Sequence, residues 1–164
     1  MVKKYIAVEP IYIGIDPGKS GAIVTLGYSS SPTIYPMPPS ERDLWAIFEP
    51  LQALEVVAVL EKVGGYVGDK GAANGSAMFN FGQGVGRLEM ALTAAGIPYE
   101  RITPQTWQRK LSVGNKKKGE TKRDWKNRLK AHAQRLFPQE QVTLSNCDAL
   151  LIALYCKRKH EGTL

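Results

Sequence analysis

Three acidic residues stand where apolar segments begin or end, and together they could bind a cation. Asp16 ends the apolar run that starts at Ile11 and precedes a Pro-Gly turn. Glu61 ends the second apolar run, Val56–Leu60, and Asp148 stands in the first turn of an apolar segment near the C-terminus. If the two strand ends lie side by side, their carboxylates come within reach of a shared cation, toward which Asp148 could also project.

Each of these acids has a purely structural alternative. Asp16 could only cap its own turn through the backbone, as Asp often does. Glu61 could be the first solvated residue after a buried strand. Asp148 follows Ser145 by three residues, the S-x-x-D spacing of a capping box in which the carboxylate accepts a hydrogen bond from the amide of the cap. The secondary structure around the acids is therefore needed to distinguish these structural roles from cation binding.

The strands expected around the acids predict an α/β fold. Ile11–Asp16 and Gly21–Leu26 are expected to form a hairpin, because Pro and Gly between them favour a tight turn. Thr33–Met37 follows as a third antiparallel strand. The nearly continuous apolar run Val56–Leu60 is typical of a strand buried on both faces, which is usually parallel to its neighbours. Tyr99–Thr103 is the expected final strand.

Helices are expected between and after these strands. In the predicted helix from Ser76 to about Ala95, Gly82, Gly84 and Gly86 each lower the stability of the helix by about 1 kcal/mol relative to Ala. A close approach to another backbone could offset this loss. The predicted helices are, in order, one capped by Ser40 with Asp43 at its third position, one from a Ser76 cap to about Ala95, a short one from Pro104, one over Lys122–Leu136 and one from Ser145.

Length and composition predict one globular domain over residues 1–164, since 43% of the residues are hydrophobic. No apolar run reaches the roughly 18 residues of a membrane helix, and the N-terminus lacks the apolar stretch of a signal peptide. We therefore expect a soluble cytoplasmic protein with no membrane partner. Cys147 and Cys156 lie too far apart in one helix to pair, and no Cys/His spacing suggests zinc, which fits a reducing compartment.

Positive charge is concentrated in one segment. The net charge is +7, and residues 101–135 hold 12 of the 22 Lys and Arg but only two of the 15 acidic residues. Such asymmetry is typical of a protein that binds a polyanion with one face; the alternative is a solvated helix that serves solubility. The candidate DNA contacts of this segment are Lys116, Lys117, Lys118, Lys122, Arg123, Lys126 and Lys130, which suit a phosphate backbone more than base recognition.

The order and spacing of these motifs resemble the RuvC-type Holliday junction resolvases, within the ribonuclease H-like nuclease superfamily. The resemblance runs from residue 11 to about 160. It is carried by Ile15-Asp16-Pro17-Gly18, Glu61 at the end of a buried strand, Phe81-Gly82-Gln83 and Asp148-Ala149-Leu150. It implies a mixed five-stranded sheet flanked by helices, a homodimer, and a magnesium-dependent endonuclease that resolves four-way DNA junctions. The chain would be a divergent, phage-type member, working in a bacterial or phage-infected cell.

The resemblance implies that Asp16, Glu61 and Asp148 are the catalytic metal ligands. Two Mg²⁺ ions about 4 Å apart can activate water and stabilise the leaving oxygen of a phosphodiester, and Mn²⁺ would be an acceptable substitute. Asp16 would bridge both ions, Glu61 would hold one and Asp148 the other. The family usually has a further Asp or His three residues before its last Asp, where this chain has Ser145. Ser145, Asn146 or water would complete the shell.

The expected DNA contacts also depart from the family pattern. After Glu61 the family often carries an aromatic residue that stacks on junction bases, whereas this chain has Gly64, with Tyr66 as the nearest substitute. We include Tyr66 and Lys62 among the candidate DNA contacts. A lysine of the family aligns with Gln108, while Lys122 resembles another lysine that follows the basic loop.

Three further functions fit parts of the sequence. One is a broader nuclease for branched or flap DNA or for RNA–DNA hybrids, and another is a junction-binding protein with weak or no cleavage, because of Ser145. In the third, residues 16–21 form the phosphate loop of an actin-like or sugar-kinase ATPase. Those ATPases need two such domains, for which 164 residues leave no room.

Overall fold

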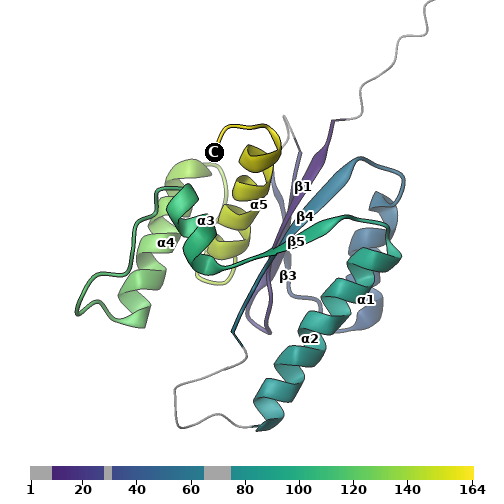
Figure 1. Cartoon of the computed structure of the whole chain (residues 1–164), viewed down its shortest axis with the longest axis horizontal. Helices are drawn as coiled ribbons and strands as arrows, with labels where there is room; N and C mark the ends of the chain where they lie inside the picture. The colour runs from purple at the N-terminus through teal and green to yellow at the C-terminus, as the bar shows by residue number, and fades with distance from the viewer. Residues whose placement is uncertain (1–8, 28–30, 65–74) are drawn as a thin grey trace, which may run out of the picture.

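The protein is described by a computed structural model that places residues 9–27, 31–64 and 75–164. A five-stranded sheet lies between two groups of helices (Figure 1). The strands are β1 (Ile11–Asp16), β2 (Ala22–Leu26), β3 (Thr33–Pro36), β4 (Val56–Glu61) and β5 (Tyr99–Ile102). The helices are α1 (Glu41–Phe48), the short 3₁₀ helix η1 (Glu49–Leu51), α2 (Gly75–Ala94), α3 (Pro104–Lys110), α4 (Lys122–Leu136) and α5 (Cys147–His160).

The sheet is mixed, and β1 lies at its centre. The strand order is β3-β2-β1-β4-β5, in which β1 pairs antiparallel with β2 and parallel with β4. β2 and β3 are antiparallel, and β4 and β5 are parallel. The carboxyl ends of β1 and β4 therefore meet at one edge of the sheet. This confirms the predicted fold class, a mixed five-stranded sheet flanked by helices.

Each face of the sheet has its own hydrophobic core. Ile13 and Ile15 of β1 pack beneath α1 and α2, together with Leu60 of β4. Tyr12 of β1 and Val59 of β4 face the opposite way and pack against α3, α4 and α5. Because successive side chains of a strand point to opposite faces, alternate residues of β1 and β4 are committed to one helical layer or the other.

Two predicted helix caps are wrong and one is confirmed. Ser40 caps α1, since its Oγ accepts a hydrogen bond from the Asp43 amide at 3.2 Å. Helix α2 already includes Gly75, so Ser76 is not its cap. Helix α5 begins at Cys147 with Asn146 at the N-cap position. The capping box of Ser145 and Asp148, the structural alternative for these residues, is therefore absent, and the Asp148 carboxylate instead pairs with Lys126.

The glycines of α2 face open space. A Cβ added at Gly82, Gly84 or Gly86 would meet no atom of the described residues within 4 Å. The close backbone approach that could offset them is thus not found within this part of the chain. Cys147 and Cys156 are both free and buried, as their spacing predicts. None of the helices in the described ranges is long and apolar enough to cross a membrane.

Candidate active site

The pleat of the sheet turns Asp16 and Glu61 toward the same face. The register pairs Ile15 with Leu60, so Asp16 and Glu61 are the next residues on two adjacent parallel strands. Asp16 shares the face of Tyr12, and Glu61 shares the face of Val59, which is the side covered by α3, α4 and α5. Strand pairing and side-chain alternation alone therefore bring these two carboxylates together.

A glycine in β1 lets α5 approach the sheet closely enough to add the third carboxylate. A Cβ at Gly14 would lie well inside van der Waals contact with the backbone nitrogen of Ala153 and the backbone oxygen of Ala149. The helix thus rests directly on the backbone of β1. Asp148 precedes Ala149 in the first turn of α5, so this contact places its carboxylate beside the end of β1. Both Asp148 and Glu61 are buried, at 8% and 9% exposure.

The turn before α5 is held by its own side chains. The Oδ1 atom of Asn146 accepts a hydrogen bond from the Thr143 amide at 2.7 Å, and its Nδ2 donates to the Gln141 carbonyl at 3.1 Å. The Asn146 amide in turn donates to Thr143 Oγ1 at 3.3 Å. Asn146 therefore fixes the entry to α5 rather than capping it, which fixes the place from which Asp148 projects.

The electrostatics show that the three acids influence one another. The pKa of Asp16 is raised to about 7, first by burial and then by the negative charge of Asp148, and Lys126 partly offsets both effects. The pKa of Glu61 is also raised to about 7, first by burial and then by Asp16, with a smaller increase from Asp148. The three carboxylates are thus short of nearby positive charge, which is the condition that a bound cation relieves.

Lys126 of α4 supplies the one positive charge found in direct contact with a carboxylate of this cluster within the described residues. Its Nζ donates to Asp148 Oδ2 in an ion pair whose side chains are 32% and 12% exposed. Burial alone would lower the pKa of Lys126, but Asp148 outweighs it and the pKa is raised above its ordinary value. The Cys147 thiol donates to the other carboxylate oxygen, Oδ1, at 3.4 Å. Lys126 therefore acts as an internal counter-ion.

Trp107 of α3 orients Glu61. The indole is fully buried, and its Nε1 donates a hydrogen bond to Glu61 Oε1 at 2.9 Å. This hydrogen bond lowers the pKa of Glu61 against the effect of burial. One carboxylate oxygen of Glu61 is thereby fixed from within the core.

The donor set suits a hard divalent cation, whereas its present geometry is that of a lysine-neutralised cluster. Three carboxylates offer only oxygen ligands, which Mg²⁺ prefers, and Mg²⁺ usually keeps several of its waters. Among the residues that the structure places, no group of three or more His, Cys, Asp or Glu side chains is arranged to hold a metal ion. Binding at Asp148 would require Lys126 to move away from it.

The other predicted site residues that the structure describes are exposed, except Lys126 and Lys130, which are half-buried. Ser145 is exposed, and its Oγ accepts a hydrogen bond from Thr143 Oγ1 at 3.4 Å. Lys62 is exposed, and its amide continues the pairing of β4 and β5 by donating to the Ile102 carbonyl at 2.7 Å. Tyr66 lies outside the described residues. The predicted basic contacts other than Lys62 lie on α4 and the loop before it, namely Lys116, Lys117, Lys118, Lys122, Arg123, Lys126 and Lys130.

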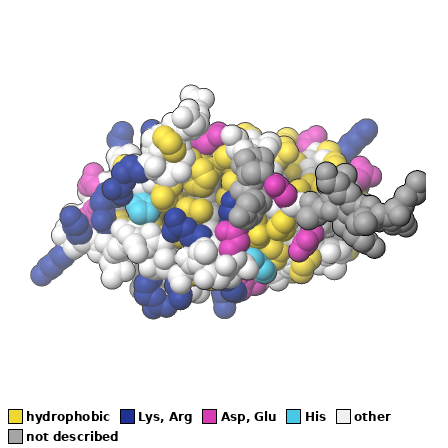
Figure 2. Space-filling model, turned by 90° about the horizontal axis from the view of Figure 1, so that it is seen from above, with side chains coloured by type: hydrophobic (Ala, Val, Ile, Leu, Met, Phe, Trp, Pro, Cys, Tyr) yellow, Lys and Arg dark blue, Asp and Glu magenta, His cyan; other side chains and the backbone are white. Residues whose placement is uncertain are grey.

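Lys and Arg side chains gather over the end of the molecule that carries α4 (Figure 2). The positive charge of residues 101–135 is therefore gathered in space as it is in the sequence. Lys126 differs from the rest of the predicted set because its ammonium is turned inward to Asp148. A cavity of about 640 Å³ lies across the sheet from the carboxylates, where Leu44 and Phe81 are among its lining residues. None of the three acids lines it.

Sequence reasoning missed two residues that build the site and the role of a third. Gly14 looks like any small residue in an apolar run, and its closeness to α5 follows only from the tertiary packing. The sequence does indicate that Trp107 needs a hydrogen-bond acceptor if it is buried, because a buried indole N–H usually has one. It does not identify Glu61 as that acceptor. Lys126 was expected to face DNA, whereas its contact with Asp148 depends on how α4 and α5 pack.

Comparisons with known proteins point to one fold. A structure of Thermus thermophilus RuvC is similar to this chain, with 18% identity, a TM-score of 0.58, and coverage of 93% of this chain and 97% of that one. T. thermophilus RuvC in complex with a Holliday junction substrate gives 16% identity, the same TM-score, and coverage of 93% and 96%. No family model and no curated protein matches the sequence. At this identity the likeness establishes architecture, and the chain has the ribonuclease H-like fold of RuvC.

Proposed function

We propose that this protein is a divalent-metal-dependent endonuclease that resolves four-way DNA junctions, with Asp16, Glu61 and Asp148 as its metal-binding carboxylates. The observation that carries the proposal is the cluster of these three acids, in which Glu61 and Asp148 are buried and the pKa values of Asp16 and Glu61 are raised to about 7. A fold similar to RuvC, one structure of which contains a Holliday junction substrate, supports it. Mg²⁺ is the proposed ion, and Mn²⁺ the expected substitute.

The chain's own residues have separate tasks in this proposal. A bound divalent ion would supply an activated water and stabilise the charge that develops on the phosphate. Asp16, Glu61 and Asp148 provide the oxygen ligands, and Trp107 holds Glu61 in a fixed orientation. Ser145, Asn146 or water would complete the coordination shell in place of a fourth acidic residue. No side-chain nucleophile is needed.

The basic end of the molecule is proposed to bind the DNA backbone. Lys116, Lys117 and Lys118 are exposed in the loop before α4. Contacts of this kind fix the position of the duplex without reading its sequence. If they carry the binding, affinity falls as salt rises, with a log-log slope of about −0.9 for each phosphate neutralised.

The proposal extends to a homodimer, because a junction has two strands to be cut. Helix α2 exposes Phe79 and Met90, at 69% and 64%, on a surface that also carries Gly82 and Gly86. Exposed large apolar side chains of this kind are common at protein–protein contacts, and the glycines would let a second backbone approach.

Cleavage of a matched set of substrates tests the function. The set comprises a synthetic four-way junction, a duplex, a flap and an RNA–DNA hybrid of the same sequence, each with Mg²⁺ and with EDTA. We expect Mg²⁺-dependent nicks on two opposed strands of the junction and much slower cutting of the duplex. Equal rates on all branched substrates would indicate a broader branched-DNA nuclease and not a junction resolvase. Tight junction binding with no product under any metal would indicate a binding protein instead.

A further inference from the structure

The loop that carries the three consecutive lysines is tied to α4 by one arginine. Arg128 Nε donates to Glu120 Oε1 at 2.7 Å, and its Nη2 donates to Glu120 Oε2 at 3.1 Å. The same Nη2 also donates to the backbone carbonyl of Asn115 at 2.8 Å. A guanidinium has five donors in a rigid fork, so one side chain can hold both a carboxylate and a carbonyl.

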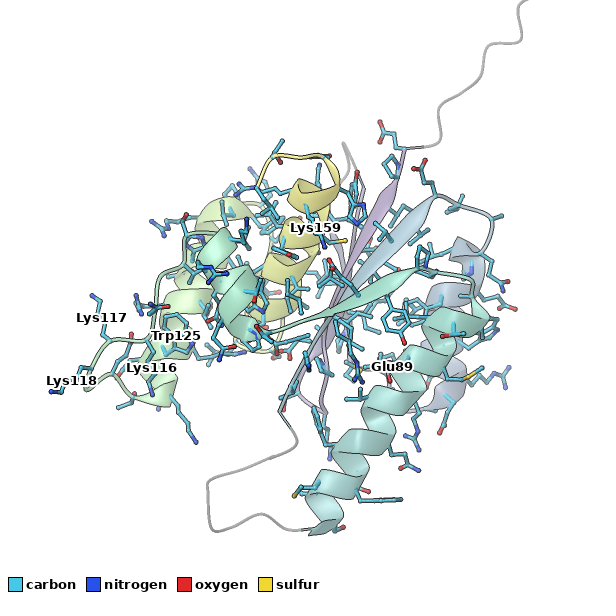
Figure 3. The ribbon with its side chains drawn as sticks, viewed as in Figure 1. Glu89, Lys116, Lys117, Lys118, Trp125 and Lys159 are labelled. Atoms are coloured by element: carbon cyan, nitrogen blue, oxygen red, sulfur yellow. The ribbon has the colours of Figure 1, made fainter. Side chains whose placement is uncertain are left out.

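Glu120, which Arg128 holds in place, is in turn hydrogen-bonded to the backbone of the lysine loop at Lys117. Its Oε2 accepts a hydrogen bond from the Lys117 amide at 2.8 Å, and its own amide donates to the Lys117 carbonyl at 3.1 Å. The backbone is therefore held on both sides of Lys116, at Asn115 by Arg128 and at Lys117 by Glu120. Lys116, Lys117 and Lys118 remain exposed at the tip of the loop (Figure 3).

The base of this arrangement is rigid. Thr121 and Asp124 form a reciprocal capping box at the start of α4, with the Asp124 amide donating to Thr121 Oγ1 at 3.1 Å. Arg128 lies over the ring of Trp125, with its Cζ 4.6 Å from the ring centroid. Trp125 is half-buried against the core beneath α4. The guanidinium is thus positioned before it reaches the loop.

We propose that the Glu120–Arg128 pair is a positioning device that holds Lys116, Lys117 and Lys118 in place as a phosphate-binding loop for DNA. The inference rests on the proposed function and adds to it the residues that preorganise the DNA contact. Neither Glu120 nor Arg128 needs to touch DNA for this role. A free loop would have to be ordered when DNA binds, and ordering before binding removes that entropic cost.

Because Glu120 is negatively charged, positioning and simple electrostatics predict opposite effects of its removal on DNA binding. Glu120 is one of two acids in the most basic segment of the chain, and hydrogen bonds from Arg128 are the main reason that its pKa lies below the ordinary value. It is therefore ionised beside a surface proposed to bind a polyanion. Coulomb attraction alone predicts that removing this negative charge tightens DNA binding. Positioning predicts that removing it weakens binding.

A double-mutant cycle, measured in EDTA, distinguishes the prediction from Coulomb attraction from the prediction from positioning. The dissociation constant of a fluorescent four-way junction would be measured for the wild-type chain, Glu120→Gln, the triple variant Lys116→Ala/Lys117→Ala/Lys118→Ala, and the combination. We expect Glu120→Gln to weaken binding by about three- to tenfold, the scale of one or two lost phosphate contacts, with a shallower salt slope. In the triple-variant background the same change should have less than about a twofold effect.

Two controls keep the outcome interpretable. Glu41→Gln breaks another glutamate–arginine pair, in which Arg87 Nε lies 2.8 Å from Glu41 Oε1 on α1, and it should leave affinity within about twofold. Arg128→Lys preserves charge but loses the fork, so it should weaken binding as Glu120→Gln does. Unchanged or tighter binding by Glu120→Gln, or equal weakening in both backgrounds, overturns the inference. A wild-type chain that binds no junction DNA overturns the proposed function as well.

Discussion

At the scale of single residues, the site is a group of carboxylates without enough positive charge. Asp16 and Glu61 are held beside each other by strand pairing, and Asp148 is added by α5. Burial and mutual repulsion raise the pKa of the first two, while Lys126 neutralises the third. Such a cluster lowers the stability of the folded protein, and the proposed divalent cation, if it binds only the folded state, would restore that stability.

The raised pKa values predict how the stability of the metal-free protein changes with pH. In the folded state Asp16 and Glu61 keep their protons up to about pH 7, whereas in the unfolded chain they lose them near pH 4. The folded state therefore binds more protons between these values, so this contribution is fully present below about pH 4 and is lost as pH rises to about 7.

Comparison with Asp16→Asn isolates this contribution. In EDTA, the free energy of unfolding of Asp16→Asn relative to wild type should increase between about pH 4 and about pH 7.5. Urea denaturation of both proteins at several pH values measures it. A difference that stays constant with pH would show that the Asp16 carboxyl is not perturbed.

Replacing Lys126 by Met tests its role as counter-ion. The change should lower the free energy of unfolding of the metal-free protein by about 1–3 kcal/mol, because buried Asp148 loses its partner. It should also increase the affinity for Mg²⁺ or Mn²⁺, since a nearby positive charge is removed. Urea denaturation and titration calorimetry give the two values. Lys130→Met, one turn further along α4, is the matched control, and an equal response from both variants would contradict the assignment.

At the scale of elements, the close contact of α5 with β1 decides where the third carboxylate lies. Gly14 is the residue that permits it, because the backbone of Ala149 and Ala153 occupies the space of a side chain. The turn before α5 is fixed by Asn146, so the helix has little freedom to shift along the strand. Geometry at the site thus depends on a residue that carries no functional group.

Gly14→Ala should therefore be far more harmful than its size suggests. We expect a loss of about 2–4 kcal/mol in stability from overpacking, and a loss of cleavage activity because Asp148 moves with α5. Gly84→Ala in α2, where a Cβ meets open space, should instead stabilise the chain by up to about 1 kcal/mol. Thermal unfolding and cleavage of the two variants provide the comparison, and similar behaviour of both would refute the close-packing argument.

Element identity followed from the sequence more readily than tertiary contact did. The bounds predicted for the first strand and for Lys122–Leu136 match β1 and α4, because alternation of apolar residues and helical spacing are local signals. The positions predicted for the three acids are also confirmed, since β1 ends at Asp16, β4 ends at Glu61 and Asp148 lies in the first turn of α5. The capping box of Ser145 and Asp148, which was the structural alternative for these residues, is absent, and Asp148 instead pairs with Lys126, which lies 22 residues away in the chain. Trp107 and Gly14 act through contacts that no local pattern encodes.

At the scale of the whole molecule, the two sides of the sheet have different expected partners. The carboxylates face the side of the sheet that carries α3, α4 and α5, and the lysine loop extends from the same side (Figure 3). Helix α2 lies on the opposite side and exposes Phe79 and Met90. DNA bound at the first side would leave α2 accessible to a second copy of the chain.

The dimer proposal predicts that a charge on α2 separates the subunits. Met90→Glu should shift the protein from dimer to monomer at micromolar concentration, because an ionised carboxylate would be buried in the contact. Sedimentation velocity measures the change. Leu164→Glu, which places the same charge at a side chain that is 41% exposed near the C-terminus, should leave the oligomeric state unchanged. A wild-type chain that is monomeric at all concentrations would exclude this contact.

Cleavage of a four-way junction by Asp16→Asn tests the central claim most directly. The substitution keeps the shape of the side chain but removes the charge needed to hold a divalent cation. Junction binding in EDTA should remain within a few-fold of wild type, while Mg²⁺-dependent cleavage should fall by roughly three orders of magnitude. Cleavage at the wild-type rate by a pure preparation of this variant would contradict the assignment of the carboxylate cluster as the active site.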